Sequence, residues 1–167
     1  TKIFPYCKEN IAQMLTVDDS RLIGAFLNMV ENHKMIVENS GLLPVAALDQ
    51  LDLKGKKAVL VLSGGNMDVI TMSSVVQHGL IQQDRIFTVS VLLPDKAGEL
   101  VKVAAAIADQ NGNVIKLEHN QFVSINRNAS VELRITMESY GTNHKQQILK
   151  ALEEKGYHPK VVDTKLY

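Results

Sequence analysis

The chain has 167 residues, a length compatible with one large domain or two small ones. Its 18 basic and 18 acidic residues give a formal net charge of zero, which argues against nucleic-acid and anionic-membrane partners. Apolar residues make up 46% of the sequence, and no apolar run approaches the roughly 20 residues of a membrane span. With Cys7 as the only cysteine, an internal disulfide is excluded. We therefore expect a cytoplasmic protein with small polar or zwitterionic partners.

Residues 8 to about 80 have the pattern of alternating strands and helices. A short apolar run at 10–17 is followed by polar residues at 18–20, whose side-chain oxygens can cap a mostly buried helix. Further helices are predicted over 43–51 and over about 67–77. The run Ala58-Val59-Leu60-Val61-Leu62 shows no alternation, which is typical of a central strand covered on both faces in a parallel sheet. The first half is therefore predicted to be an α/β unit.

From Arg85 onward, apolar and polar residues alternate, which is typical of strands with one buried face. The spacing of Leu100, Val103, Ala104 and Ile107 predicts a helix between two such strands. In chain order, the predicted elements are strand 87–93, helix 100–107, strand 113–124, strand 131–137, helix 143–155 and strand 157–162. This βαββαβ order predicts a ferredoxin-like antiparallel sheet with two helices on one face. We place the domain boundary within residues 80–84, which gives domains 1–82 and 83–167.

Five motifs carry a resemblance to a known family. Glu38-Asn39-Ser40-Gly41, Lys54-Gly55-Lys56-Lys57 and Leu62-Ser63-Gly64-Gly65-Asn66-Met67-Asp68 resemble the closing motifs of the catalytic domain of threonine and serine dehydratases. Leu93-Pro94-Asp95-Lys96-Ala97-Gly98-Glu99-Leu100 and Asn111-Gly112-Asn113-Val114 resemble the ligand-loop motifs of the ACT fold. The resemblance implies the C-terminal part of a pyridoxal-phosphate-dependent, tryptophan-synthase-β-like domain, followed by an ACT regulatory domain.

The resemblance also implies a cofactor site at Ser63, Gly64, Gly65 and Glu38. In this family pattern, the Ser63 hydroxyl faces the pyridine nitrogen of pyridoxal 5'-phosphate. A serine cannot hold that nitrogen protonated, so the ring is a weaker electron sink, suited to eliminating a β-hydroxyl. From the residues alone, Ser63 could instead cap a helix, the two glycines could bind an anion, and Glu38 could have a capping or surface role.

The sequence departs from the family in lacking a Ser-x-Lys motif with the Schiff-base lysine and a glycine-rich phosphate loop. We therefore expect a fragment of a longer enzyme, with no catalytic residue of its own and with no activity by itself. His33, His78, His144 and His158 lie in polar stretches without the spacing of metal ligands, so we expect solvated histidines and no metal site.

An amino-acid effector site is implied in the second half, at the loop joining the first strand to the first helix. Gly98 would allow the loop backbone to approach a ligand closely, and the exposed amides at the helix start suit a carboxylate. Ala97 stands where the family often has proline. The effector residues implied are Asp95, Lys96, Ala97, Gly98, Leu100, Asn113 and Val114, the last two lying across from the loop in pairs of ACT domains.

Taken together, the resemblance implies the regulatory part of a threonine ammonia-lyase, which converts L-threonine to 2-oxobutanoate and ammonia. Its ACT domain would bind isoleucine or valine and would form a homo-oligomer by edge-to-edge pairing. Two alternatives stay open: a non-catalytic amino-acid-binding or dimerisation module, and a relative of serine dehydratase.

Overall fold

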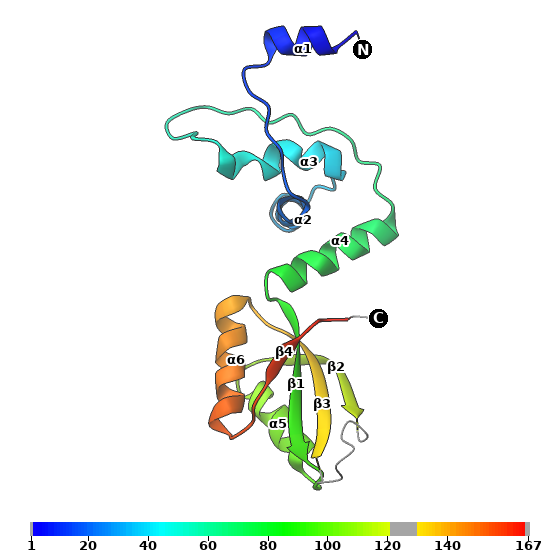
Figure 1. Ribbon diagram of the computed structural model, residues 1–167, viewed down its shortest axis with the longest axis vertical. Coiled ribbons are helices and arrows are strands. Elements are labelled where there is room, and N and C mark those ends of the chain that lie inside the picture. Colours follow the sequence, from blue (N-terminus) through cyan, green and yellow to red (C-terminus); the bar gives the residue numbers. More distant parts are fainter. Residues whose placement is uncertain (1, 121–129, 166–167) are drawn as a thin grey trace. The chain divides into compact units, whose positions relative to one another are not determined.

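The computed structural model describes residues 2–120 and 130–165, and these divide into two compact units at residues 79 and 80 (Figure 1). Each unit has its own hydrophobic core. Helix α4, Val69–Gln82, begins in the first unit and ends in the second. Among the described residues, no helix is long and apolar enough to cross a bilayer.

The first unit, residues 1–79, is built from helices. Its elements are α1 (Phe4–Asn10), α2 (Asp19–Asn28), a π-helical turn (Met29–His33), α3 (Asn39–Ala46), a 3-10 turn (Leu48–Gln50) and the start of α4. Phe26 and Leu42 are fully buried where α2 packs on α3, together with Met29 and Val37. The predicted helix after residue 20 is thus confirmed as α2, with its apolar side inward.

The strand predicted over 58–62 is wrong, because residues 51–68 form no regular element. Val59 and Val61 are 92% and 72% exposed, the reverse of a strand covered on both faces. A strand needs hydrogen bonds from a neighbouring strand, and the described residues of the first unit contain none. In the apolar run at 10–17, Asn10 ends α1 and the rest is irregular and largely exposed. The helix predicted over 43–51 begins earlier, at Asn39, and ends at Ala46 before a 3-10 turn.

The described residues of the second unit, which spans 80–167, form one antiparallel sheet and two helices after the end of α4. Its elements are β1 (Ile86–Pro94), α5 (Glu99–Ala108), β2 (Asn113–Asn120), β3 (Ser130–Glu138), α6 (Thr142–Glu154) and β4 (Lys160–Val162). The sheet order is β2-β3-β1-β4, with every neighbouring pair antiparallel. The predicted βαββαβ arrangement is confirmed. Residues 121–124, the predicted end of the second strand, lie outside the described residues.

Alternation along the strands separates the two faces of this sheet. Val89, Val91, Leu133 and Ile135 are fully or almost fully buried, and they form one core with residues of α5 and α6. The opposite face, which we call the open sheet face, carries polar side chains from the intervening positions, among them Thr88, Ser90, Glu132, Arg134 and Thr136. The prediction of one dry face and one wetter face is therefore confirmed.

The junction between α4 and β1 is fixed by Asp84, which has a left-handed backbone with φ of 56°. The N–H groups of Asp84 and Arg85 donate to the carbonyls of Ile81 and Leu80, the pattern of a Schellman C-cap that usually has glycine at this position. Asp84 can occupy it because its side chain is held in place by α6. This gives β1 a defined starting direction.

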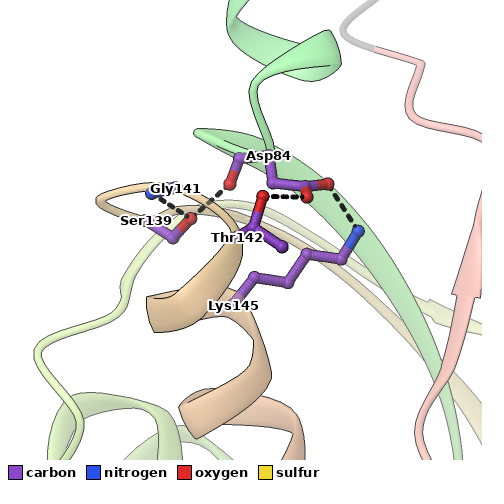
Figure 2. Close-up of polar contacts among 5 residues, drawn as sticks. All are labelled: Asp84, Ser139, Gly141, Thr142 and Lys145. Atoms are coloured by element: carbon purple, nitrogen blue, oxygen red, sulfur yellow. Dashed lines mark hydrogen bonds and ion pairs between the residues drawn. The ribbon is translucent and has the colours of Figure 1, made fainter.

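Figure 2 shows how α6 and the turn before it bind Asp84. The carboxylate of Asp84 accepts hydrogen bonds from Lys145 Nζ at 2.7 Å and Thr142 Oγ1 at 2.8 Å, and its carbonyl accepts one from Ser139 Oγ. The Lys145 side chain is only 14% exposed and its ammonium lies 5.4 Å from the centre of the Phe87 ring. The hydrogen bond from Lys145 lowers the pKa of Asp84 most, and the hydrogen bond from Thr142 lowers it further.

Candidate functional site

The four residues expected at the cofactor lie together in the first unit, where the start of α3 meets the loop after residue 62. The N–H of Glu38 donates to the carbonyl of Gly64 at 3.2 Å, and Ser40 Oγ donates to Glu38 Oε1 at 2.6 Å. Gly64 has φ of 83°, and a Cβ on it would lie 2.3 Å from the Glu38 side chain. We call Glu38, Ser40, Gly41 and residues 63–65 the Ser63 cluster.

Close approach of two backbones holds the Ser63 cluster together. A Cβ on Gly41 would lie 1.8 Å from the carbonyl oxygen of Ser63, so only glycine fits at this position of α3. Ser63, Gly64 and Gly65 are all exposed. The helix-cap interpretation of Ser63 is wrong, since Asp68 caps α4 by accepting hydrogen bonds from Thr71 N at 2.9 Å and Thr71 Oγ1 at 2.6 Å. Ser63 therefore presents its hydroxyl at the surface of the unit.

The second candidate site is a cavity of about 240 Å³ at the loop between β1 and α5. Gly98 is the N-cap of α5 with φ of 91°, and no side chain caps this helix. The first-turn N–H groups of such a helix have no partner inside the helix and suit a carboxylate. The cavity is lined by Leu93, Pro94, Asp95, Lys96, Ala97, Gly98, Glu99, Leu100, His119 and Val131. Five of the expected effector residues thus line one cavity.

Asn113 and Val114, the other two expected effector residues, lie at the opposite end of the sheet. Asn113 pairs with Glu138, and its amide donates to Glu138 Oε2 at 2.7 Å, while Val114 packs partly buried against the core. Within one chain, neither residue joins the cavity at the β1–α5 loop.

Two histidines have contacts that their sequence context did not indicate. His119 on β2 lines the cavity at the β1–α5 loop, because β2 and β1 both pair antiparallel with β3 and therefore end at the same end of the sheet, with the start of β3 between them. His144 lies in the first turn of α6 and is held by hydrogen bonds rather than solvated: its Nδ1 accepts from the Tyr140 N–H at 3.0 Å, and its Nε2 contacts the Gln110 carbonyl at 2.5 Å. Alternation along β2 alone could not reveal which distant loop His119 would face.

In the part of the chain that is described, no group of three or more potential ligands is arranged for a metal ion.

The fold and the candidate sites define an α/β chain with a helical unit followed by a ferredoxin-like unit. No protein-family model matches its sequence. The chain is similar to the L-threonine ammonia-lyase of Thermotoga maritima, at 29% identity over 160 residues, which are 95% of this chain and 40% of that protein. It is 33% identical to the L-threonine ammonia-lyase of Geobacter sulfurreducens over 157 residues, which are 92% of this chain and 39% of that protein.

A third relative, L-threonine dehydratase biosynthetic IlvA of Halalkalibacterium halodurans, is 26% identical over 71% of this chain and 29% of its own length. The resemblance to threonine ammonia-lyases is therefore confirmed over nearly the whole chain, which spans about 40% of the length of the first two relatives. Among solved structures, prephenate dehydratase from Streptococcus mutans matches 46% of the chain with a TM-score of 0.39 and 21% identity. Formyltetrahydrofolate deformylase from Burkholderia mallei matches 47% with a TM-score of 0.34 and 14% identity.

Proposed function

We propose that this chain is the regulatory and cofactor-adjacent part of a pyridoxal-phosphate-dependent threonine ammonia-lyase. The observation that carries the proposal is the similarity to proteins named L-threonine ammonia-lyase across both units, together with the two sites described above. In the whole enzyme, L-threonine would be converted to 2-oxobutanoate and ammonia. Residues 1–82 would close the catalytic domain, and residues 83–167 would form an ACT domain that senses an amino acid.

The cavity at the β1–α5 loop supports the sensing role. Leu93, Leu100 and Val131 give it an apolar side, while the start of α5 offers backbone N–H groups without a side-chain cap. A branched aliphatic amino acid has matching chemistry, with a carboxylate for the amides and an alkyl side chain for the apolar wall. Isoleucine and valine are therefore the proposed effectors.

A second copy of the chain would complete this effector site. β2 is an edge strand, and its Ile115 and Leu117 are 42% and 40% exposed. If two β2 strands pair antiparallel about a two-fold axis, the start of one lies beside the end of the other. Asn113 of the partner subunit would then lie near His119 and the loop cavity. The same pairing removes two exposed edges from the sheets.

The Ser63 cluster supports the cofactor-adjacent role. Its residues fit one edge of pyridoxal phosphate, with the exposed Ser63 hydroxyl available to the ring nitrogen and Glu38 beside the same loop. The bound cofactor would supply the electron sink for elimination of the β-hydroxyl. Neither a lysine nor a phosphate-binding loop belongs to the cluster formed by these described residues, so the chain by itself is expected not to deaminate threonine.

Exposed apolar residues of the first unit also fit this assignment. Val59, Val61, Val69 and Ile70 are between 72% and 92% exposed. Four such exposed apolar side chains within residues 59–70 favour an interaction site in this segment. The remainder of a catalytic domain is the proposed cover for these side chains.

A non-catalytic amino-acid-binding module is the second candidate function, favoured by the lack of an anchoring lysine in the Ser63 cluster. A lyase that acts on serine instead of threonine is the third.

Thermal unfolding of the 167-residue chain with the common amino acids tests the sensing role. A ligand that binds only the folded state stabilises it by about 2.7 kcal/mol at a concentration 100 times its Kd. We expect isoleucine or valine to raise the Tm of the wild-type chain, and the Gly98→Val variant to lose this response because its side chain enters the loop that meets the carboxylate.

The Gly156→Val variant is the matched control. Gly156 also has a left-handed backbone, with φ of 86°, and open space around its Cβ position, but it lies in the turn before β4. It should carry a similar backbone cost and keep the response to isoleucine. Equal responses in both variants, or no response of the wild type to either amino acid, would contradict the proposed effector site.

A further inference from the structure

The open sheet face contains a second pocket, of about 330 Å³, in the centre of the second unit. This volume is at the lower end of the range for small-molecule sites. The pocket lies on the face opposite α5 and α6 and is separate from the cavity at the β1–α5 loop. It is lined by Thr88, Lys116, Glu118, Arg134, Thr136, Val162, Asp163 and Lys165.

Strand register explains why these side chains meet. Lys116, Thr136, Thr88 and Val162 are successive partners across all four strands. Glu118 and Arg134 are partners two residues further along, on the same face. Two adjacent cross-strand rows therefore build the pocket, and the segment after β4 adds Asp163 and Lys165. Because every strand contributes, the pocket depends on the correctly folded sheet.

The floor of the pocket is a pair of threonines. Thr88 and Thr136 are only 5% and 3% exposed, and their hydroxyl oxygens lie 2.9 Å apart in a hydrogen bond. One of the two hydroxyls donates to the other, and the donating oxygen keeps its lone pairs while the accepting oxygen keeps a proton. The floor therefore offers both a donor and an acceptor, which suits a ligand that carries a hydroxyl group.

The walls carry both signs of charge. Lys116 Nζ lies 2.8 Å from Glu118 Oε1, a contact that lowers the pKa of Glu118 and keeps this carboxyl ionised at neutral pH. Arg134 donates through Nε to Glu132 at 3.2 Å, which engages one of its three guanidinium nitrogens. Lys165 and Asp163 face the same space from the C-terminal segment. The lining thus contains three cations and two carboxylates.

We infer that this pocket binds a small hydrophilic zwitterion, namely an α-amino acid with a polar side chain. The ligand carboxylate meets Arg134 and Lys165, its ammonium meets Glu118 and Asp163, and its side chain lies over the threonine hydroxyls. Val162 is the sole apolar side chain in the described lining, so a branched aliphatic ligand gains little there. Polyanions such as nucleotides are repelled by the two carboxylates and exceed the available space.

This inference goes beyond the proposed function, because the pocket shares no residue with the loop cavity assigned to isoleucine. The chain would hold two amino-acid sites of different chemistry, one on each side of the sheet. If one of the two sites does not bind its proposed amino acid, binding at the other can still be tested.

The test is a titration of the 167-residue chain with L-threonine and L-serine, followed by calorimetry and by amide chemical shifts. We expect shifts in β2, β3 and the segment after β4, and a Kd at least tenfold higher in Arg134→Gln, which corresponds to about 1.4 kcal/mol. The matched control is Lys150→Gln, which removes one positive charge from the exposed face of α6 and should leave the Kd unchanged. If Arg134→Gln fails to fold, Lys165→Gln serves as the second variant, since Lys165 is the other cation assigned to the ligand carboxylate.

Two blocked ligands test the requirement for both charges. Threonine methyl ester lacks the carboxylate and N-acetylthreonine lacks the ammonium, so each should bind at least tenfold more weakly than threonine. If N-acetylthreonine binds as well as threonine, the pocket is a simple anion site and the inference is overturned. It is likewise overturned if threonine shifts only the amides of residues 93–100 or if both charge variants bind with the wild-type Kd.

Discussion

Replacing Asp84 by asparagine should destabilise the second unit at neutral pH. Asparagine also accepts a left-handed backbone, so the Asp84→Asn variant keeps the C-cap of α4 and removes only the charge. The side chain of Asp84 is 25% exposed and that of Lys145 is 14% exposed, so solvent screens this pair less than a surface pair. Removal of the carboxylate leaves the Lys145 ammonium largely enclosed without its counter-charge.

Hydrogen bonds to charged groups contribute about 1.5–3 kcal/mol each to stability. Because Thr142 can still donate to the asparagine carbonyl, we expect the variant to lose about 2 kcal/mol in total, mainly from the contact with Lys145. For a unit of this size, such a loss lowers the Tm by roughly 8–16 °C. This effect is large enough to measure by calorimetry or by urea unfolding.

The effect should depend on pH in a defined direction. The folded-state pKa of Asp84 is lowered, so its contribution to stability is fully present above the unfolded-state pKa near 3.8 and is lost as pH falls through the folded-state value. The difference between wild type and Asp84→Asn should therefore be constant near neutral pH and should narrow as pH falls below about 4.

Urea unfolding of both proteins between pH 3 and pH 7 measures this difference. Asp109→Asn is the matched control, since Asp109 contacts Lys155 at 3.2 Å but is 64% exposed, and its loss should change stability by no more than about 1 kcal/mol. Equal unfolding free energies of wild type and Asp84→Asn at pH 7, or a gap that does not narrow between pH 7 and pH 3, would refute the reasoning.

Two further pairs of substitutions test close packing in the first unit and a buried hydrogen bond in the second. Gly41→Ala should destabilise the first unit by about 1–3 kcal/mol, because its Cβ would overlap the Ser63 carbonyl. Gly24→Ala in α2 is the matched control, since its Cβ would meet no atom within 4 Å and should stabilise the helix by up to about 1 kcal/mol. Amide hydrogen exchange in α3 should become faster in the first variant and not in the second. Thr136→Val should cost about 1–3 kcal/mol by leaving the buried Thr88 hydroxyl unpaired, and adding Thr88→Val should recover part of that loss in urea unfolding.

The second unit could be predicted from the sequence because its signals are local and agree with one another. Alternation at Val89 and Val91 fixed the buried face of β1, and the spacing of Val103 and Ile107 fixed that of α5. The order of the elements then leaves few ways to pair four strands. Boundaries were less accurate, since β4 is confined to Lys160–Val162 although the apolar pattern begins at Tyr157.

The first unit was harder to predict because its structure depends on distant contacts. The run 58–62 has the composition of a buried strand, yet its conformation depends on strands that the described residues of this unit do not supply. In its first turn, α3 is in close contact with the backbone of Ser63, which lies 22 residues after Gly41 in the sequence. No local propensity encodes such a contact. The motifs nevertheless identified Glu38, Ser63 and Gly64 as residues that lie together.

The Asp84 contact also sets an order of events during synthesis. Lys145 lies 61 residues after Asp84, so the ribosome must release α5, the sheet strands β1 to β3 and the first turn of α6 before the ammonium can reach the carboxylate. Until then, the C-cap at Asp84 has its two backbone hydrogen bonds, but the Asp84 carboxylate lacks the contacts with Thr142 and Lys145. The end of α4 therefore gains its side-chain contacts with α6 only when most of the second unit has been synthesised, so this helix end is tied to the completion of the unit that follows it.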